Sequence, residues 1–154
     1  MRIRLLCVGR LGERPVSLLA RDYARRASAV GRSLGLGPVE IVEVEARKPG
    51  REAEAAALLA RAGEARLIAC DEQGEALASR AFAERLAFWR DGGARELAFM
   101  IGGADGLPPD LLERAADRLA FGPQTWPHAL ARVMLAEQVF RAASLLAGTP
   151  YHRA

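Results

Sequence analysis

The sequence contains no asparagine, a single lysine, two cysteines and two histidines. Cys7 and Cys70 lie far apart without a CxxC spacing, and with His128 and His152 they offer no zinc-like ligand pattern, so we expect no metal. Both cysteines fall in apolar runs, where we expect buried thiols. No apolar run approaches the ~20 residues of a membrane span, and the first is too short for a signal peptide. We therefore expect a cytoplasmic protein without membrane association.

The size and charge of the chain set broad limits on its function. At 154 residues, it fits one domain spanning residues 1–154. Its net charge of +3 permits a nucleic-acid partner without requiring one. Lys48 is the only lysine among 22 basic residues. Arginine suits phosphate and base recognition, although this bias and the missing asparagine also fit a GC-rich or thermophilic source.

Short β-type runs alternate with helical patterns along the whole chain. Apolar residues at positions 19, 23, 27, 30 and 34 recur at three- and four-residue spacing and predict an amphipathic helix, which Pro15 is placed to open. The alternation predicts an α/β fold with a mainly parallel sheet and helices on both faces. We expect strands at 2–8, 39–45, 66–70, 96–101 and 118–121, and helices at 16–34, 52–63, after a Ser79 cap, near Asp110 and at 128–147.

Three loops should meet at the carboxyl edge of such a sheet, where ligands bind: DEQG at 71–74, GGADG at 102–106 and GPQTWPH at 122–128. IGGADG lacks both the GxGxxG spacing and the GK[ST] of a P-loop. It is either a tight turn or a place where backbone approaches a ligand. GPQTWP, held by two prolines, either presents main-chain groups to an adenine-like ring or is a rigid connector.

The last helix and the tail carry the remaining candidates. The helix combines apolar positions, expected to serve core and subunit packing, with Arg132 and Glu137 as a candidate ion pair and His128 at its start as a capping or packing residue. The tail offers a stacking ring, a group titrating near neutrality and a planar cation, in Tyr151, His152 and Arg153. Together these suit a nucleotide, and the alternative is a frayed terminus.

Three motifs resemble one enzyme family: FMIGGADG at 99–106, TWPHALARVMLAEQVFRA at 125–142 and TPYHR at 149–153. They are similar to the bacterial SPOUT methyltransferases that modify N3 of a pseudouridine in 23S ribosomal RNA. The resemblance covers essentially the whole chain. It implies a homodimer and a SPOUT α/β-knot, in which the C-terminal part is threaded into a trefoil knot. The chain departs from the family pattern at Ala129, Phe140 and Gly148, where proline, tyrosine and asparagine are frequent.

The resemblance also implies the ligands and the site. The target is 23S rRNA, in helix 69 of the large subunit within assembled ribosomes. The tail residues Tyr151, His152 and Arg153 approach the methyl donor of the partner subunit and act in catalysis. The donor, S-adenosyl-L-methionine, is held largely through backbone groups by Cys70, Gly102, Gly103, Gly122, Pro123, Gln124, Thr125, Trp126 and Pro127.

Methyl transfer to a ring nitrogen requires alignment of donor and acceptor and removal of one proton. We expect His152 to accept that proton, Tyr151 to stack on or orient the base, and Arg153 to hold phosphate or a developing oxyanion. A simpler variant gives the tail a positioning role alone. Two other classes stay open, a non-catalytic knotted RNA-binding or ribosome-associated protein and a Rossmann-like nucleotide enzyme, although the latter lacks its glycine fingerprint.

Overall fold

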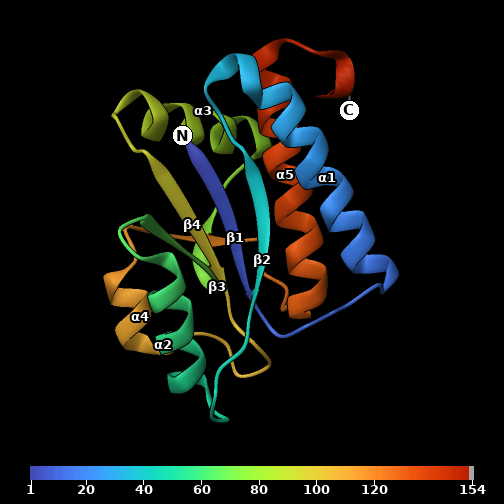
Figure 1. Ribbon diagram of the computed structural model, residues 1–154. Helices are drawn as coiled ribbons and strands as arrows, with labels where there is room; N and C mark the ends of the chain where they lie inside the picture. The colour runs from blue at the N-terminus through green and yellow to red at the C-terminus, as the bar shows by residue number, and fades with distance from the viewer. Residues whose placement is uncertain (153–154) are drawn as a thin grey trace.

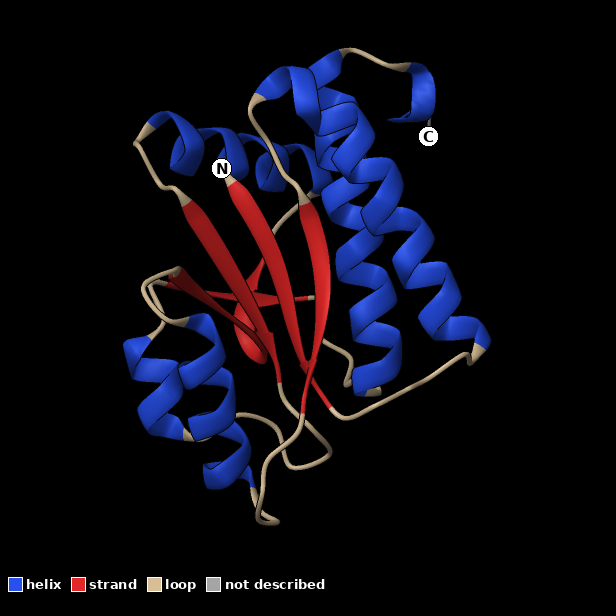
Figure 2. Cartoon of the chain, viewed as in Figure 1, coloured by secondary structure: helices blue, strands red, loops and turns tan. Residues whose placement is uncertain are grey.

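The computed structural model describes residues 1–152, with His152 described through its backbone alone. Strands and helices alternate along the chain (Figures 1 and 2). The strands are β1 (Arg2–Val8), β2 (Val39–Val44), β3 (Arg66–Ala76), β4 (Glu96–Ile101) and β5 (Asp117–Ala120). The helices are α1 (Pro15–Gly31), α2 (Arg51–Ala62), α3 (Ser79–Asp91), α4 (Pro109–Arg114) and α5 (His128–Ala147), with 3₁₀ turns at Arg32–Leu34 and Pro150–His152.

The five strands form one parallel sheet in the order β2-β1-β4-β3-β5. One hydrophobic cluster joins α1, α3 and α5 to one face of the sheet, and a second joins α2 and α4 to the other. Side chains of β1 alternate between the two clusters, as the period of a strand requires. The predicted α/β fold with both faces covered is therefore confirmed, and every carboxyl strand end lies at one edge (Figure 1).

Helix α1 buries the predicted apolar stripe only in part. Its fully buried residues are Ser17, Ala20, Ala24, Ala27 and Gly31, and all of them are small. Tyr23 and Val30 of the predicted stripe pack against the core cluster and are partly buried, whereas Leu19 is 47% exposed. Helix α1 lies along α5 (Figure 1), and small residues between two helices allow their backbones to approach closely.

Two local predictions at α3 and β3 are also wrong. Ser79 does not cap α3, because Ala78 occupies the cap position and the Ser79 hydroxyl donates to Gln138 Oε1 over 2.8 Å. The segment 71–74, expected to be a loop, belongs to β3, whose pairing with β5 shifts register between Cys70 and Glu75. Such an irregularity re-aims side chains at a sheet edge without ending the strand.

Arg132 on α5 is the largest fully buried side chain, at 1% exposure. Its Nη2 donates to the carbonyl oxygen of Gly9 over 3.2 Å and to that of Val8 over 3.4 Å. Nη1 lies 3.8 Å from Glu43 Oε1 on β2, and the other oxygen of Glu43 accepts from the Leu11 amide over 2.8 Å. One side chain thus joins α5 to the carboxyl ends of β1 and β2.

We predict that Arg132→Ala lowers the free energy of unfolding by about 3 kcal/mol, because it leaves the Glu43 carboxylate partly buried without this cation. Urea denaturation measures the change. Arg14→Ala is the matched control, because Arg14 is exposed and has no ion pair among residues 1–152, and it should stay within about 0.5 kcal/mol. An Arg132→Ala loss as small as the control's would contradict the structural role.

Candidate functional site

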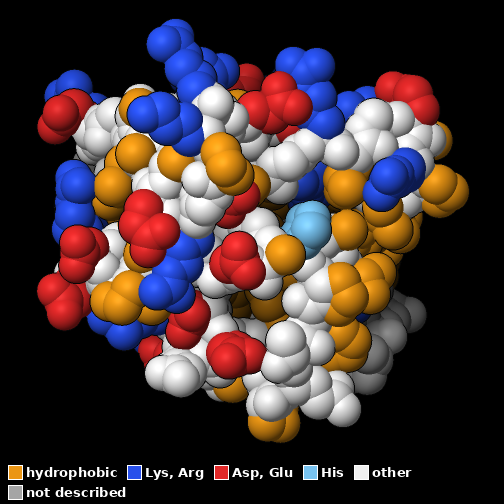
Figure 3. All heavy atoms as spheres, turned by 90° about the horizontal axis from the view of Figure 1, so that it is seen from below, with side chains coloured by type: hydrophobic (Ala, Val, Ile, Leu, Met, Phe, Trp, Pro, Cys, Tyr) orange, Lys and Arg blue, Asp and Glu red, His pale blue; other side chains and the backbone are white. Residues whose placement is uncertain are grey.

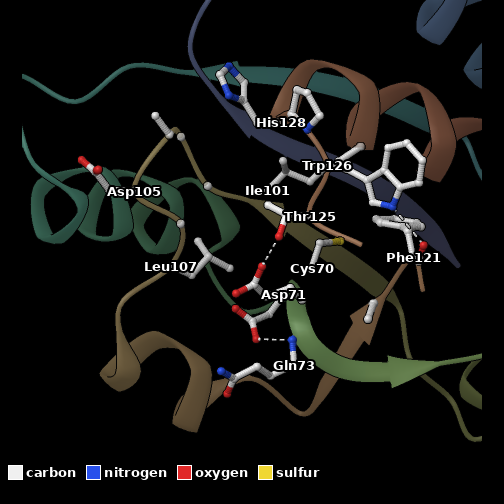
Figure 4. A pocket seen from close by; sticks show the side chains of 18 of the residues that line it. Cys70, Asp71, Gln73, Ile101, Asp105, Leu107, Phe121, Thr125, Trp126 and His128 are labelled. Carbon is white, nitrogen blue, oxygen red and sulfur yellow. Dashed lines mark hydrogen bonds between the residues drawn. The ribbon is translucent and has the colours of Figure 1, made fainter. Parts of the chain in front are cut away.

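A cavity of about 860 Å³ opens at the carboxyl edge of the sheet. Its walls come from the end of β3, the β4–α4 loop, the β5–α5 loop and the first turn of α5 (Figure 4). These are the three segments at which the sequence predicts ligand binding. Figure 3 views this end of the molecule and shows basic and acidic side chains interspersed around a hollow.

Most of the residues assigned to the methyl donor come together here. Seven of the nine line the cavity: Cys70, Gly102, Gly103, Gln124, Thr125, Trp126 and Pro127. Gly122 lines a neighbouring cavity, and Pro123 lines neither of the two. Sequence reasoning missed the apolar wall, which includes Ile101, Leu107 and Leu119. Nothing in their apolar character separates them from the core, so only the fold could identify them.

The β4–α4 loop is a tight turn that also lines the cavity, which confirms the first of the two interpretations of its glycines and leaves the approach to a ligand a prediction. Gly103 and Gly106 form an isolated bridge, with the Gly106 amide donating to the Gly103 carbonyl oxygen over 3.1 Å. A Cβ at Gly102 would lie 2.7 Å from the Gly106 carbonyl oxygen, so a side chain would displace backbone. A Cβ at Gly103 would instead meet the Glu54 carboxylate at 2.9 Å, a flexible group that can move.

Two side-chain hydrogen bonds, both drawn in Figure 4, hold the β5–α5 loop in place. Thr125 Oγ1 donates to Glu72 Oε2 over 2.8 Å, and Trp126 Nε1 donates to the Phe121 carbonyl oxygen over 3.1 Å. Trp126 is 38% exposed, so it is not the core residue considered as an alternative for it. His128 is the first residue of α5 and lines the cavity.

The charged groups of the cavity are mostly acidic. Asp71, Glu72 and Asp105 line it, and Arg51 is its one arginine or lysine among the described residues. Burial, and then the neighbouring Cys7 and Asp71, raise the pKa of the Cys70 thiol far above its usual range. Cys70 is therefore a neutral wall group and not a nucleophile. Residues 1–152 contain no group of three or more His, Cys, Asp or Glu side chains placed to hold a metal ion.

The tail lies at the opposite end of α5 from the cavity (Figure 1). The two ends of α5, a helix of 20 residues, are about 30 Å apart, although the side chain of Tyr151 reaches back to Glu137, near the middle of the helix. Tyr151 packs on Phe140 with ring centroids 4.4 Å apart, and its hydroxyl donates to Glu137 Oε1 over 3.0 Å. Arg153 and the side chain of His152 fall outside the described residues. Within one chain, the structure does not bring Tyr151 to the cavity.

Glu137 pairs with Arg141 over 2.7 Å, not with Arg132 as the sequence suggested. Burial, then hydrogen bonding with Tyr23 and Glu137, raises the pKa of Tyr151 far above its usual range. Tyr151 is thus a hydrogen-bond donor at neutral pH and no proton acceptor. The i,i+4 spacing of Glu137 and Arg141 was a readable signal for this pair.

A second, more apolar cavity of about 570 Å³ lies between α1, α5 and the end of β5. Leu19, Tyr23, Val133 and Met134 contribute to its wall. Other exposed apolar side chains on these two helices are Leu18 and Leu130, at 48% and 41% exposure. Leu18 and Leu19 are thus the large apolar side chains of α1 that point away from the hydrophobic core.

A family model described as a predicted SPOUT methyltransferase matches residues 1–152. The chain belongs to this SPOUT methyltransferase family. Membership excludes the Rossmann-like enzyme considered from the sequence. No helix among the described residues is long and apolar enough to span a bilayer.

Relatives of this SPOUT chain match it from end to end. Proteins named ribosomal RNA large subunit methyltransferase H are 61% identical in Phenylobacterium zucineum and 62% in Caulobacter sp. strain K31, each alignment covering 99% of both chains. The one from Hyphomonas neptunium is 55% identical over all of both chains. A solved putative methyltransferase from Legionella pneumophila with bound SAM covers 95% of this chain and 66% of its own, at 12% identity and a TM-score of 0.45, too remote to support an argument.

For this SPOUT site we predict that Gly102→Ala weakens S-adenosylmethionine binding by roughly tenfold or more, because the new methyl group displaces the backbone of the cavity wall. Gly103→Ala is the matched control, with a smaller loss expected since only the end of Glu54 must move. Isothermal titration calorimetry measures both affinities. Equal losses would show that the close approach at Gly102 does not shape the cavity.

Proposed function

We propose that this protein transfers a methyl group from S-adenosylmethionine to N3 of a pseudouridine in 23S rRNA. The target lies in helix 69 of assembled ribosomes, and the whole chain acts in the cytoplasm as one knotted domain within a homodimer. The observation that carries the proposal is the single cavity at which the end of β3 and two loops meet. The relatives, whose names state large-subunit rRNA methylation, support the substrate class.

The cavity fits the methyl donor in size and in chemistry. Its volume of about 860 Å³ lies within the range of small-molecule sites. The bare backbone at Gly102 leaves room that a side chain would fill. Bound there, the donor supplies an electrophilic methyl group. Backbone groups of the β4–α4 and β5–α5 loops hold its adenosine part, and the carboxylates of Asp71, Glu72 and Asp105 favour a cationic ligand.

A second copy of the chain completes the active site. Tyr151 packs against the middle of α5 and does not line the cavity of its own subunit, which supports a site completed by the tail of a partner. The apolar surface of α1 and α5 supports a dimer, because Leu18, Leu19 and Leu130 are exposed in the single chain. The contacts of Tyr151 with Glu137 and Phe140 fix the base of the tail, which compensates for Gly148.

Each of the three tail residues has a separate role in methyl transfer. His152 accepts the N3 proton, because its unperturbed pKa of about 6.5 suits a base at neutral pH, whereas Tyr151 stays protonated. Tyr151 orients the base, and Arg153 stabilises negative charge on the phosphate or on a carbonyl oxygen. Alignment of donor and acceptor supplies most of the rate.

The direct test is to incubate the protein with methyl-labelled S-adenosylmethionine and assembled ribosomes, digest the 23S rRNA and identify the nucleoside by mass spectrometry. We expect N3-methylpseudouridine in helix 69. Donor binding without incorporation would reject the RNA target and retain the cofactor. Absence of donor binding as well would favour the non-catalytic alternative.

We predict that His152→Ala lowers turnover with saturating ribosomes and donor by roughly 10²-fold or more, as expected on loss of a general base. Donor affinity should stay unchanged, because His152 acts on the N3 proton of the acceptor base and does not hold the donor. His128→Ala is the matched control, because His128 is the other histidine and lines the cavity. A His152→Ala enzyme with near-normal turnover would leave the tail with a positioning role alone.

We further predict that two impaired variants complement each other in mixed dimers when the donor concentration is kept below its dissociation constant, where Gly102→Ala loses most of its activity. A dimer of one His152→Ala chain and one Gly102→Ala chain contains one intact pairing of cavity and tail. Random mixing should therefore recover about a quarter of wild-type activity. Coexpression with two affinity tags isolates the mixed species. If each mixed dimer remains inactive, the tail does not act across the subunit interface.

A further inference from the structure

The connection between β2 and α2, residues 45–50, leaves the carboxyl end of β2 and leads directly into Arg51, which lines the cavity (Figure 1). Arg51, the first residue of α2, lines the cavity, and a Cβ at Gly103 would lie 2.9 Å from the Glu54 carboxylate one turn further on. The start of α2 is thereby packed against the β4–α4 loop. Arg47 and Lys48 lie four and three residues before Arg51 in this connection, and both are exposed.

Residues 47–51 carry cations that the protein itself does not neutralise. Arg47 and Lys48 are exposed and form no ion pair with any of the residues 1–152. Arg51 pairs only with its neighbour Glu52, over 3.2 Å, and both side chains are solvent-accessible, so that pair is weak. We call Arg47, Lys48 and Arg51 the basic rim.

The location of the basic rim matters more than its charge alone. The inner wall of the cavity is acidic, with Asp71, Glu72 and Asp105, and repels a phosphate chain. Cations at the mouth beside an acidic interior attract a polyanion to the entrance while leaving a cationic ligand inside. An exposed segment with a proline and a glycine also has main-chain groups free to contact phosphate.

We propose that the basic rim is the docking surface for the phosphodiester backbone of the RNA substrate, next to the nucleotide that receives the methyl group. The inference rests on the proposed function and specifies which surface of the protein the RNA contacts. Arg47 and Lys48 contact phosphates directly. Arg51 lies between the RNA and the donor cavity.

The test compares two double variants with the same loss of charge. In Arg47→Ala/Lys48→Ala the rim is removed, whereas Arg61→Ala/Arg95→Ala removes two exposed arginines at the opposite end of the sheet, which also lack ion pairs among the described residues. Ribosome affinity is measured by filter binding from 50 to 200 mM salt. Methyl incorporation into 23S rRNA and calorimetric S-adenosylmethionine affinity are measured in parallel.

For the rim variant we expect ribosome affinity to fall by roughly tenfold at 0.1 M salt and the slope of log affinity against log salt to decrease by about 2. Its donor affinity should match wild type, and the distal variant should bind ribosomes as wild type does. A rim variant with wild-type affinity and slope, or a distal variant with the same loss, would overturn the docking surface. Wild-type protein that binds ribosomes without methylating them would overturn the proposed function instead.

Discussion

The arrangement of the site depends on one buried cation. Arg132 donates to the last carbonyl groups of β1 and lies beside Glu43 of β2, so it fixes the first half of α5 against the carboxyl edge of the sheet. Burying this guanidinium has a considerable free-energy cost, because its Nε and Nη1 make no hydrogen bond within the described residues. A buried guanidinium tolerates few alternative positions of its helix. His128 lies one turn before Arg132 and Ala131 lies next to it, so both are held in the cavity wall.

Helix α5 also determines how far apart the two functional ends lie. Its first turn lines the donor cavity and its last turn leads to Tyr151, which Glu137 and Phe140 hold in place. A straight helix of 20 residues cannot bring its two ends together. The same helix that forms one wall of the cavity therefore leads the chain away from that wall at its other end.

The packing of α1 buries its small residues and leaves two leucines exposed. Small residues such as Ala20 and Ala24 let α1 lie close to α5, and Leu18 and Leu19 are turned outward as a consequence. Their side chains join the apolar surface around the second cavity. An amphipathic pattern counts apolar residues without distinguishing a core position from an exposed one. That is the physical reason why Leu19 of the predicted stripe lies outside the core although Tyr23, Ala27 and Val30 pack as predicted.

The sequence by itself determined the alternation of strands and helices, the parallel sheet and the three segments that converge on the cavity. Hydrophobic periodicity and the backbone preferences of glycine and proline are local properties, so they can be recognised without the fold. The motifs near residues 99–106 and 125–142 also identified the family. Only the tertiary structure decided that residues 71–74 continue β3, that Arg132 reaches Glu43 instead of Glu137, and that Tyr151 packs against the middle of α5, outside the cavity. These features arise from contacts between residues far apart in the chain, which no local pattern encodes.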